Sequence, residues 1–210
     1  MQNVDVAGTS ADAVADAVRA VVVADTTAGT AEGTIADTLA ARVSRTVRDI
    51  PDFPTSGVLF KDITPVLSDA ALLREVIVAM AGPHTAAGIT HVVGIESRGF
   101  LFGVPIALEL GCAFVPARKP GKLPYQTVRE SYALEYRDDM LEMHQDALGR
   151  GARVLVVDDV LATGGTASAA TRLVSQLGGS VTAIAVLIEL GFLNGRRALG
   201  NLPVHSLITY

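Results

Sequence analysis

The sequence predicts an α/β fold in which a mainly parallel, open sheet is flanked by helices. Short apolar runs, which suit buried strands, alternate along the chain with stretches of about twelve residues that have helical spacing. Glycine and proline residues punctuate many of the transitions between the two patterns. Half of the 210 residues are apolar, which is enough to bury one sizeable core.

Four stretches whose apolar residues recur every three or four positions are predicted to be helices: Ile35–Val47, Ala70–Ala81, Gly99–Leu110 and Ala167–Leu177. A short helix is expected at Gly195–Leu199. The predicted strands are His91–Ile95, Cys112–Pro116, Arg153–Val157, Val181–Ile188 and Val204–Ile208. Residues 117–139 interrupt the alternation, because they are charged and contain two prolines, and we expect an excursion with extended arms there.

The first 33 residues differ in composition from the rest of the chain. They are rich in Ala, Asp, Thr, Gly and Val and contain neither aromatic residues nor proline. We therefore expect a low-complexity, flexible N-terminal extension at 1–33, with a helix over Ser10–Ala24, and one domain at 34–210.

Several classes of protein are disfavoured by composition. No apolar run approaches the ~18 residues that a membrane span needs, and we expect no secretory signal. Cys112 is the only cysteine, which excludes an intrachain disulfide, and the four histidines show no zinc-site or triad spacing. A net charge of −5 disfavours a nucleic-acid partner. We expect a cytoplasmic protein with neither nucleic-acid nor membrane partners.

The most informative segment is Val154–Thr166, in which an apolar run is followed by Asp158, Asp159 and a loop rich in Thr and Gly that precedes a helix. Backbone N–H groups at a helix N-terminus bind phosphate, and the helix dipole favours the negative charge. Glycines let the backbone approach a ligand closely. Carboxylates accept hydrogen bonds from sugar hydroxyls or help to hold a divalent metal. The segment therefore predicts a site for phosphate and sugar.

This segment is neither a Walker loop nor a Gly-x-Gly-x-x-Gly motif. It resembles the phosphoribosyl-pyrophosphate (PRPP) signature of type I phosphoribosyltransferases. Four more blocks occur in the order and approximate spacing typical of the adenine phosphoribosyltransferase family: Phe53–Pro65, Glu96–Gly103, Arg118–Pro124 and Ser131–Tyr136. The resemblance extends over about residues 34–210.

The resemblance implies the reaction of adenine with PRPP to give AMP and pyrophosphate, with Mg²⁺, in a purine-salvage homodimer. It also implies a small N-terminal base-binding hood, a mobile lid and a non-proline cis peptide at Glu96–Ser97. The implied ribose and 5-phosphate residues are Asp158, Asp159, Ala162, Thr163, Gly164, Gly165 and Thr166. The implied pyrophosphate residues are Ser97, Arg98, Arg118, Lys119 and Lys122. Adenine is assigned to Leu59, Phe60 and Lys61, and catalysis to Glu135 as proton partner of the purine and Tyr136 as its neighbour.

The metal has no dedicated set of protein ligands in this assignment. Mg²⁺ is expected to arrive with PRPP, and Asp158 and Asp159 are the carboxylates that could help to hold it.

The chemistry supports these roles independently of the resemblance. Displacing pyrophosphate from the anomeric carbon builds positive charge on the ribose and negative charge on the leaving group, so the site needs cations, carboxylates and a proton partner. Arg98 opens a helix after a strand, and the basic loop containing Arg118 and Arg129 is long enough for an active-site lid. Simpler interpretations remain: a surface ion pair for Arg98, a core aromatic for Phe60, and an edge-strand pair for Glu135 with Tyr136.

Two departures from the family pattern concern the site directly. Glu96 stands where Asp is common, so its carboxylate reaches one methylene further, and Lys61 stands where some members carry Arg. Three other functions remain open: a phosphoribosyltransferase for xanthine, hypoxanthine or orotate, a PRPP-sensing regulator, and a nucleotide-binding protein without activity.

Overall fold

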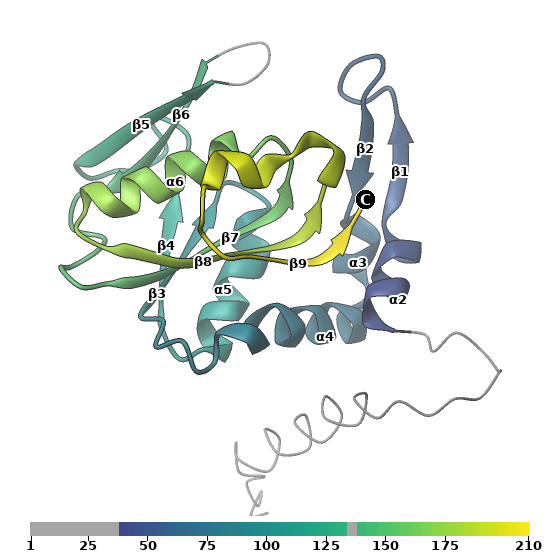
Figure 1. The fold of residues 1–210 in the computed structure, drawn as a ribbon, viewed down its shortest axis with the longest axis horizontal. Coiled ribbons are helices and arrows are strands. Elements are labelled where there is room, and N and C mark those ends of the chain that lie inside the picture. Colours follow the sequence, from purple (N-terminus) through teal and green to yellow (C-terminus); the bar gives the residue numbers. More distant parts are fainter. Residues whose placement is uncertain (1–37, 134–137) are drawn as a thin grey trace, which may run out of the picture. The chain divides into compact units, whose positions relative to one another are not determined.

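The computed structural model describes residues 38–133 and 138–210, all of which belong to one compact unit (Figure 1). The predicted extension at 1–33, its Ser10–Ala24 helix, and the catalytic pair Glu135 and Tyr136 lie outside the described residues.

The central sheet has five parallel strands in the order β4-β3-β7-β8-β9, as the alternation of strands and helices predicted. Its strands are β3 (His91–Ile95), β4 (Ala113–Ala117), β7 (Arg153–Leu161), β8 (Ser180–Glu189) and β9 (Val204–Thr209). Each predicted strand is found within a few residues of its expected bounds. The central strand β7 is longer than predicted, and this changes the site.

The prediction that the strand ends at Val157 was wrong. β7 continues through Asp158 and Asp159 to Leu161, because its backbone stays paired with β8: Asp158 lies opposite Val186, and Leu161 lies opposite Glu189. The two carboxylates are therefore part of a strand and not of the loop after it.

Helices cover both faces of the sheet, with α6 on one side and α4 and α5 on the other (Figure 1). The α-helices are α2 (Leu39–Thr46), α3 (Thr64–Ser68), α4 (Ala70–Ala81), α5 (Gly99–Glu109) and α6 (Gly165–Gln176). Short 3₁₀ helices lie at Gly82–His84, Gly191–Leu193 and Gly195–Leu199. Helix α4 has the predicted bounds, and its N-cap Asp69 accepts hydrogen bonds from the N–H groups of Ala71 and Leu72, each at 3.0 Å.

Two hydrophobic cores lie on the two faces of the sheet. Leu155 and Val157 of β7 belong to the core under α4 and α5, while Val154 and Val156 belong to the core under α6. All four side chains are fully buried, since successive side chains of a strand point to opposite faces. This explains why the strand reads as a continuous apolar run.

Two antiparallel ribbons stand at the sides of the sheet. The excursion predicted for residues 117–139 contains strand β5 (Thr127–Ala133), which pairs with β6 (Asp138–His144). The second ribbon, β1 (Arg48–Pro51) with β2 (Leu59–Asp62), rises beside the C-terminus (Figure 1). Strand β1 was not predicted, because its four residues include two charges and a proline and show no apolar alternation.

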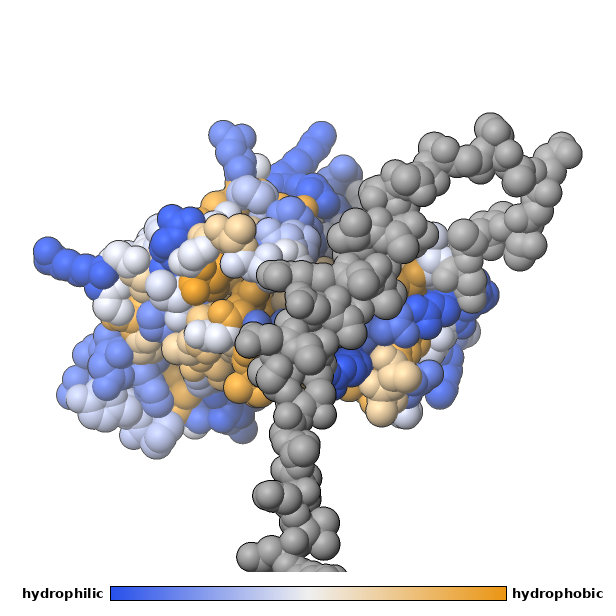
Figure 2. Space-filling model, turned by 90° about the horizontal axis from the view of Figure 1, so that it is seen from below, coloured by the Kyte–Doolittle hydropathy of each residue, from blue (hydrophilic) through white to orange (hydrophobic). Residues whose placement is uncertain are grey.

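The surface seen from below combines hydrophilic and hydrophobic residues (Figure 2). Helix α5 exposes Leu101, Val104 and Leu108, which share one helical face, with exposed fractions of 48%, 42% and 78%. No helix within residues 38–133 and 138–210 is long and apolar enough to cross a bilayer.

Candidate active site

The junction between β7 and α6 has the backbone geometry that a phosphate site requires. Gly164 is the N-cap of α6 and has a positive φ of 82°, and a Cβ there would overlap the backbone carbonyl oxygen of Gly195. The first intrahelical bond is donated by Ser168 N to Gly164 O at 2.9 Å, so the N–H groups of the first turn have no partner within the helix. Helix α6 begins at Gly165, two residues before the predicted start, which places Gly165 and Thr166 in that first turn.

The carboxylates of Asp158 and Asp159 lie close together at the same end of β7. Burial, reinforced by the charge of Asp159, raises the pKa of Asp158 well above its ordinary value. Burial also raises the pKa of Asp159, against the opposing effect of Arg98. The N–H of Asp159 donates to Asp158 Oδ1 at 2.9 Å. The pair is costly to keep charged, which is typical of groups placed for function and not for stability.

Arg98 connects these carboxylates to the base-binding segment. Its Nε lies 2.9 Å from Asp159 Oδ2, an ion pair in which the N–H is not aligned for a hydrogen bond. The guanidinium group of Arg98 also lies over the ring of Phe60, with 5.0 Å between Arg98 Cζ and the ring centroid. Arg98 therefore brings together residues that the sequence assigned to pyrophosphate, ribose and adenine.

The turn that carries Arg98 joins β3 to α5. The Glu96–Ser97 peptide bond is cis although no proline follows it, as the family resemblance implied. Gly99 opens α5 against the strand: a Cβ there would lie 2.7 Å from Val157 O. Only glycine lets the turn approach β7 this closely.

Glu96 holds the basic turn that follows β4. It accepts a forked pair of hydrogen bonds from Arg118, Nε to Oε2 at 3.2 Å and Nη2 to Oε1 at 3.1 Å, and a third from Lys119 N at 2.9 Å. Burial alone would raise the pKa of Glu96, but these hydrogen bonds hold it below its ordinary value. Arg118 Nη1 also donates to Lys122 O at 3.0 Å.

Each of three predicted pyrophosphate residues is thus paired with a carboxylate. Arg98 meets Asp159, Arg118 meets Glu96, and the third pair joins Lys119 Nζ to Asp139 Oδ2 at 3.1 Å. Asp139 also accepts a hydrogen bond from the buried Tyr132 hydroxyl at 3.1 Å. Sequence reasoning assigned no role to these last two residues, although Tyr132 lies in the Ser131–Tyr136 block.

Tyr132 links the β5–β6 ribbon to the loop Ala162–Thr166, the candidate phosphate loop, through the Thr166 hydroxyl. Burial raises the pKa of its hydroxyl, the Thr166 hydroxyl opposes the increase, and the charges of Asp139 and Asp158 add to it. The alternation of side chains along β5 places this ring toward the core under α6.

The residues assigned to adenine divide between the two faces of β2. Phe60 meets Phe53 edge to face, with ring centroids 5.1 Å apart, and points toward Arg98. Lys61 points the other way: its Nζ lies 2.6 Å from Asp49 Oδ1 and 3.8 Å from the centroid of the Tyr210 ring. The structure brings Phe60 to the other site residues and turns the Lys61 ammonium away from them.

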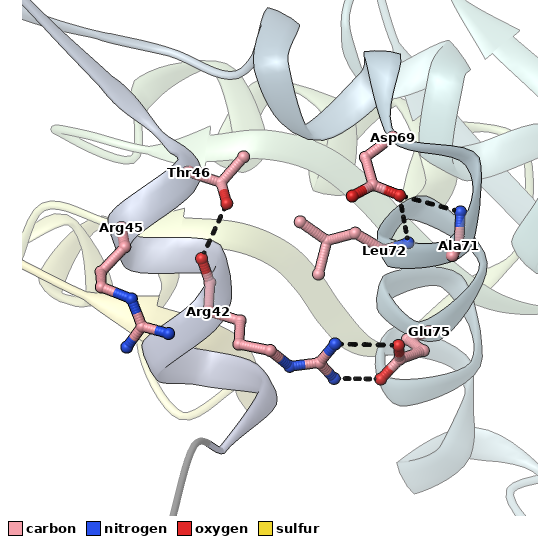
Figure 3. A pocket seen from close by; sticks show the side chains of 7 residues that line it. All are labelled: Arg42, Arg45, Thr46, Asp69, Ala71, Leu72 and Glu75. Carbon is pink, nitrogen blue, oxygen red and sulfur yellow. Dashed lines mark hydrogen bonds and ion pairs between the residues drawn. The ribbon is translucent and has the colours of Figure 1, made fainter.

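Two hollows in the surface of the described residues lie away from this site. One of about 230 Å³ between α2 and α4 is lined by Arg42, Arg45, Thr46, Asp69, Ala71, Leu72 and Glu75 (Figure 3). Arg42 forms a forked ion pair with Glu75 across it. Another, of about 270 Å³, lies beside His205 and Arg196. Neither contains a predicted site residue, so the assignment of the active site rests on the chemistry of the β7–α6 junction.

The described residues contain no cluster of three or more His, Cys, Asp and Glu side chains able to hold a metal ion by themselves. A divalent ion at Asp158 and Asp159 would need oxygen ligands from water or substrate.

A parallel sheet with a glycine-capped phosphate loop, paired strand-end aspartates and a set of cations defines a class of enzyme, the phosphoribosyltransferases. A family model, the phosphoribosyl transferase domain, matches residues 67–198. Adenine phosphoribosyltransferase of Anaeromyxobacter dehalogenans is 58% identical over 168 residues, 80% of this chain and 98% of that protein. The chain belongs to the adenine phosphoribosyltransferase family, whose members are pentosyltransferases.

Solved structures agree with this membership. The crystal structure of adenine phosphoribosyltransferase from Rhodothermus marinus is 52% identical, with a TM-score of 0.79, over 82% of this chain and 98% of that one. The Saccharomyces cerevisiae enzyme, crystallised with an imino-altritol bisphosphate and adenine, is 39% identical with a TM-score of 0.76, over 80% of this chain and 98% of that one.

Proposed function

We propose that this enzyme transfers the 5-phosphoribosyl group of PRPP to adenine, giving AMP and pyrophosphate in purine salvage. The observation that carries the proposal is the position of Arg98, 2.9 Å from Asp159 and 5.0 Å from the Phe60 ring. An aromatic plate for a base, a cation for a leaving group and a carboxylate for a ribose thus meet at one point. The adenine in the yeast relative's crystal supports the choice of base.

In the proposed reaction the bond from the anomeric carbon to pyrophosphate breaks and a bond to adenine N9 forms, with loss of the N9 proton. The N–H groups of Gly165 and Thr166 hold the 5-phosphate at the start of α6. Asp158 and Asp159 accept hydrogen bonds from the ribose hydroxyls and offset the positive charge that develops on the ribose ring. The cations Arg98, Arg118, Lys119 and Lys122 take the negative charge of the leaving group.

Asp158 and Asp159 fit a role beside Mg²⁺, because hard oxygen ligands suit that ion and Asp159 Oδ2 is buried without an aligned hydrogen bond. The ion would arrive with PRPP and add positive charge at the departing pyrophosphate.

We propose Glu135 as the proton partner of the purine and Tyr136 as its positioning neighbour, following the family resemblance. Replacing Glu135→Gln should lower kcat about tenfold or more, since the amide cannot exchange the proton, while the melting temperature stays unchanged. Steady-state kinetics with both substrates saturating measure this. Glu109→Gln, at the exposed end of α5, removes a carboxylate of the same kind far along the chain and should leave kcat unaltered. Near-normal turnover in Glu135→Gln would exclude this role.

We further propose a homodimer. The exposed apolar face of α5, formed by Leu101, Val104 and Leu108, supports self-association, since burying such a face from water is favourable. Sedimentation equilibrium of the full chain tests it, and a monomer at assay concentration would contradict it. The cytoplasmic location expected from the sequence stays a prediction.

The decisive test of function is to incubate the enzyme with PRPP, Mg²⁺ and each of adenine, hypoxanthine, xanthine and orotate. We expect AMP and pyrophosphate with adenine. A preference for a 6-oxopurine would refute the choice of base. PRPP binding without product from any base would instead favour a regulator or a catalytically inactive nucleotide-binding protein.

A further inference from the structure

Glu142 is a buried carboxylate that the proposed reaction does not use. It lies in β6 and is 1% exposed. Burying a carboxylate is costly unless partners compensate for the lost water. Its neighbours along the strand, Leu141 and Met143, are buried apolar side chains on the opposite face. The partners of Glu142 should therefore reveal why a charge is kept there.

Those partners belong to the turn that carries the proposed pyrophosphate cations. The backbone of Glu142 exchanges two hydrogen bonds with Arg118: Arg118 N donates to Glu142 O at 2.9 Å, and Glu142 N donates to Arg118 O at 2.7 Å. Its side-chain Oε2 accepts a hydrogen bond from Gly121 N at 3.2 Å. Glu142 thus holds the turn at its first residue through backbone hydrogen bonds and at Gly121 through its carboxylate.

Arg129 supplies the counter-charge. It lies directly opposite Glu142 in the β5–β6 register, and its Nε is 2.7 Å from Glu142 Oε1. The Arg129 side chain is 64% exposed, so water solvates its charge and the ion pair stabilises Arg129 little. The ion pair therefore compensates the charge of the buried carboxylate. We assign Arg129 to this pair and not to pyrophosphate binding, although it lies in the same basic loop as Arg118.

We propose that Glu142 is a positioning residue for pyrophosphate, fixing the turn from Arg118 to Lys122 before the substrate arrives. The inference rests on the proposed function. Gly121 has a positive φ of 75°, and its N–H is held by the carboxylate. Without that acceptor the turn keeps its ties to β6 at Arg118 and Lys119 but nothing from β6 holds Gly121, and the end of the turn must be ordered when the ligand binds. That ordering reduces affinity.

The contacts of Glu142 also predict which ligands its loss affects. The carboxylate of Glu142 contacts the basic turn at Gly121 and the side chain of Arg129, both on the pyrophosphate side of the proposed site. Its loss should weaken the affinity for pyrophosphate and raise the KM for PRPP while leaving the KM for adenine unchanged. A general loosening of the domain would move all three.

The test compares Glu142→Met and Glu142→Gln in the full chain. Isothermal titration with inorganic pyrophosphate and Mg²⁺ gives Kd, and initial rates give KM for each substrate. We expect Glu142→Met to raise the pyrophosphate Kd and the PRPP KM about tenfold, with the adenine KM within about twofold. Glu142→Gln should fall between it and the wild type, because an amide oxygen still accepts from Gly121 while the NH₂ group meets Arg129 as a second donor. This isosteric variant also serves if Glu142→Met does not fold.

Met143→Ala is the matched control. Met143 is fully buried in the same strand but faces the core, so its truncation should lower the melting temperature and leave the pyrophosphate Kd unchanged. The inference is overturned if both Glu142 variants keep the wild-type Kd, or if Met143→Ala weakens pyrophosphate binding as much as they do. Wild-type enzyme that binds pyrophosphate but forms no AMP from adenine would refute the proposed base and leave Glu142's role intact. Wild-type enzyme that binds no pyrophosphate would refute both.

Discussion

The phosphate loop and the basic turn, the two anion sites that we propose, differ in how their donors are held in place. At the β7–α6 junction the donors are backbone N–H groups, and their positions follow from one glycine and the start of one helix. In the turn from Arg118 to Lys122 the proposed donors are side chains, and those of Arg118 and Lys119 are each held by a carboxylate from another segment. The first site is local in sequence and the second is assembled over long distances. Substitutions in the loop should therefore act through backbone geometry, and substitutions in the turn should act through charge and hydrogen bonding.

The largest effect should come from Gly164→Ala. The new Cβ would overlap Gly195 O, and the φ of +82° disfavours any side chain, so the loop must move. We expect kcat/KM for PRPP to fall by about 100-fold or more, because small displacements of positioning groups are costly. Gly151→Ala is the control: it has nearly the same φ, +83°, but open space around the Cβ position. It should lose about 1 kcal/mol of stability and keep its activity. Equal losses in both variants would show that strain alone matters.

A smaller effect is expected from Arg118→Lys. Lysine keeps the charge but cannot form the fork with Glu96, so the turn loses two hydrogen bonds while the positive charge remains near pyrophosphate. We expect the KM for PRPP to rise about tenfold with little change in kcat. Raising the salt concentration should weaken PRPP binding further in this variant, because the lysine ammonium, no longer held by Glu96, is more exposed to screening than the arginine guanidinium. An unchanged KM would mean that charge alone, without the fork, is sufficient.

The same contrast explains what could be predicted from the sequence. The sheet and helices followed from apolar periodicity, and the proposal of a phosphate loop rests on thirteen adjacent residues, Val154–Thr166. Strand β1 and the true end of β7 were missed, since pairing with a neighbouring strand decides both. The carboxylate partners were missed for a similar reason: Glu96 and Arg118 are 22 residues apart, and only the packing of β3 beside β4 brings them together. A single sequence contains the residues of such a pair but not their contact.

The smallest expected effect is a difference in pH dependence. Burial would raise the pKa of Glu96, but the hydrogen bonds from Arg118 and Lys119 hold it below its ordinary value of 4.5 in the folded protein. A lowered pKa means that its stabilising contribution is present above pH 4.5 and is lost as the pH falls through the folded-state value. Glu96→Gln should therefore show a shallower loss of unfolding free energy below pH 4.5 than the wild type, with a difference of about 1 kcal/mol or less. Urea unfolding of both proteins over this range measures it.

The backbone donors of the phosphate loop do not titrate in that range, so Gly164→Ala provides the comparison. It should be destabilised by an amount that does not change with pH, giving a curve parallel to that of the wild type. Parallel curves for Glu96→Gln as well would contradict the contribution assigned to the fork. A shallower curve for Glu96→Gln alone would locate the charge-dependent part of the proposed site in the basic turn, since the donors that the loop offers to an anion are backbone N–H groups, which do not titrate.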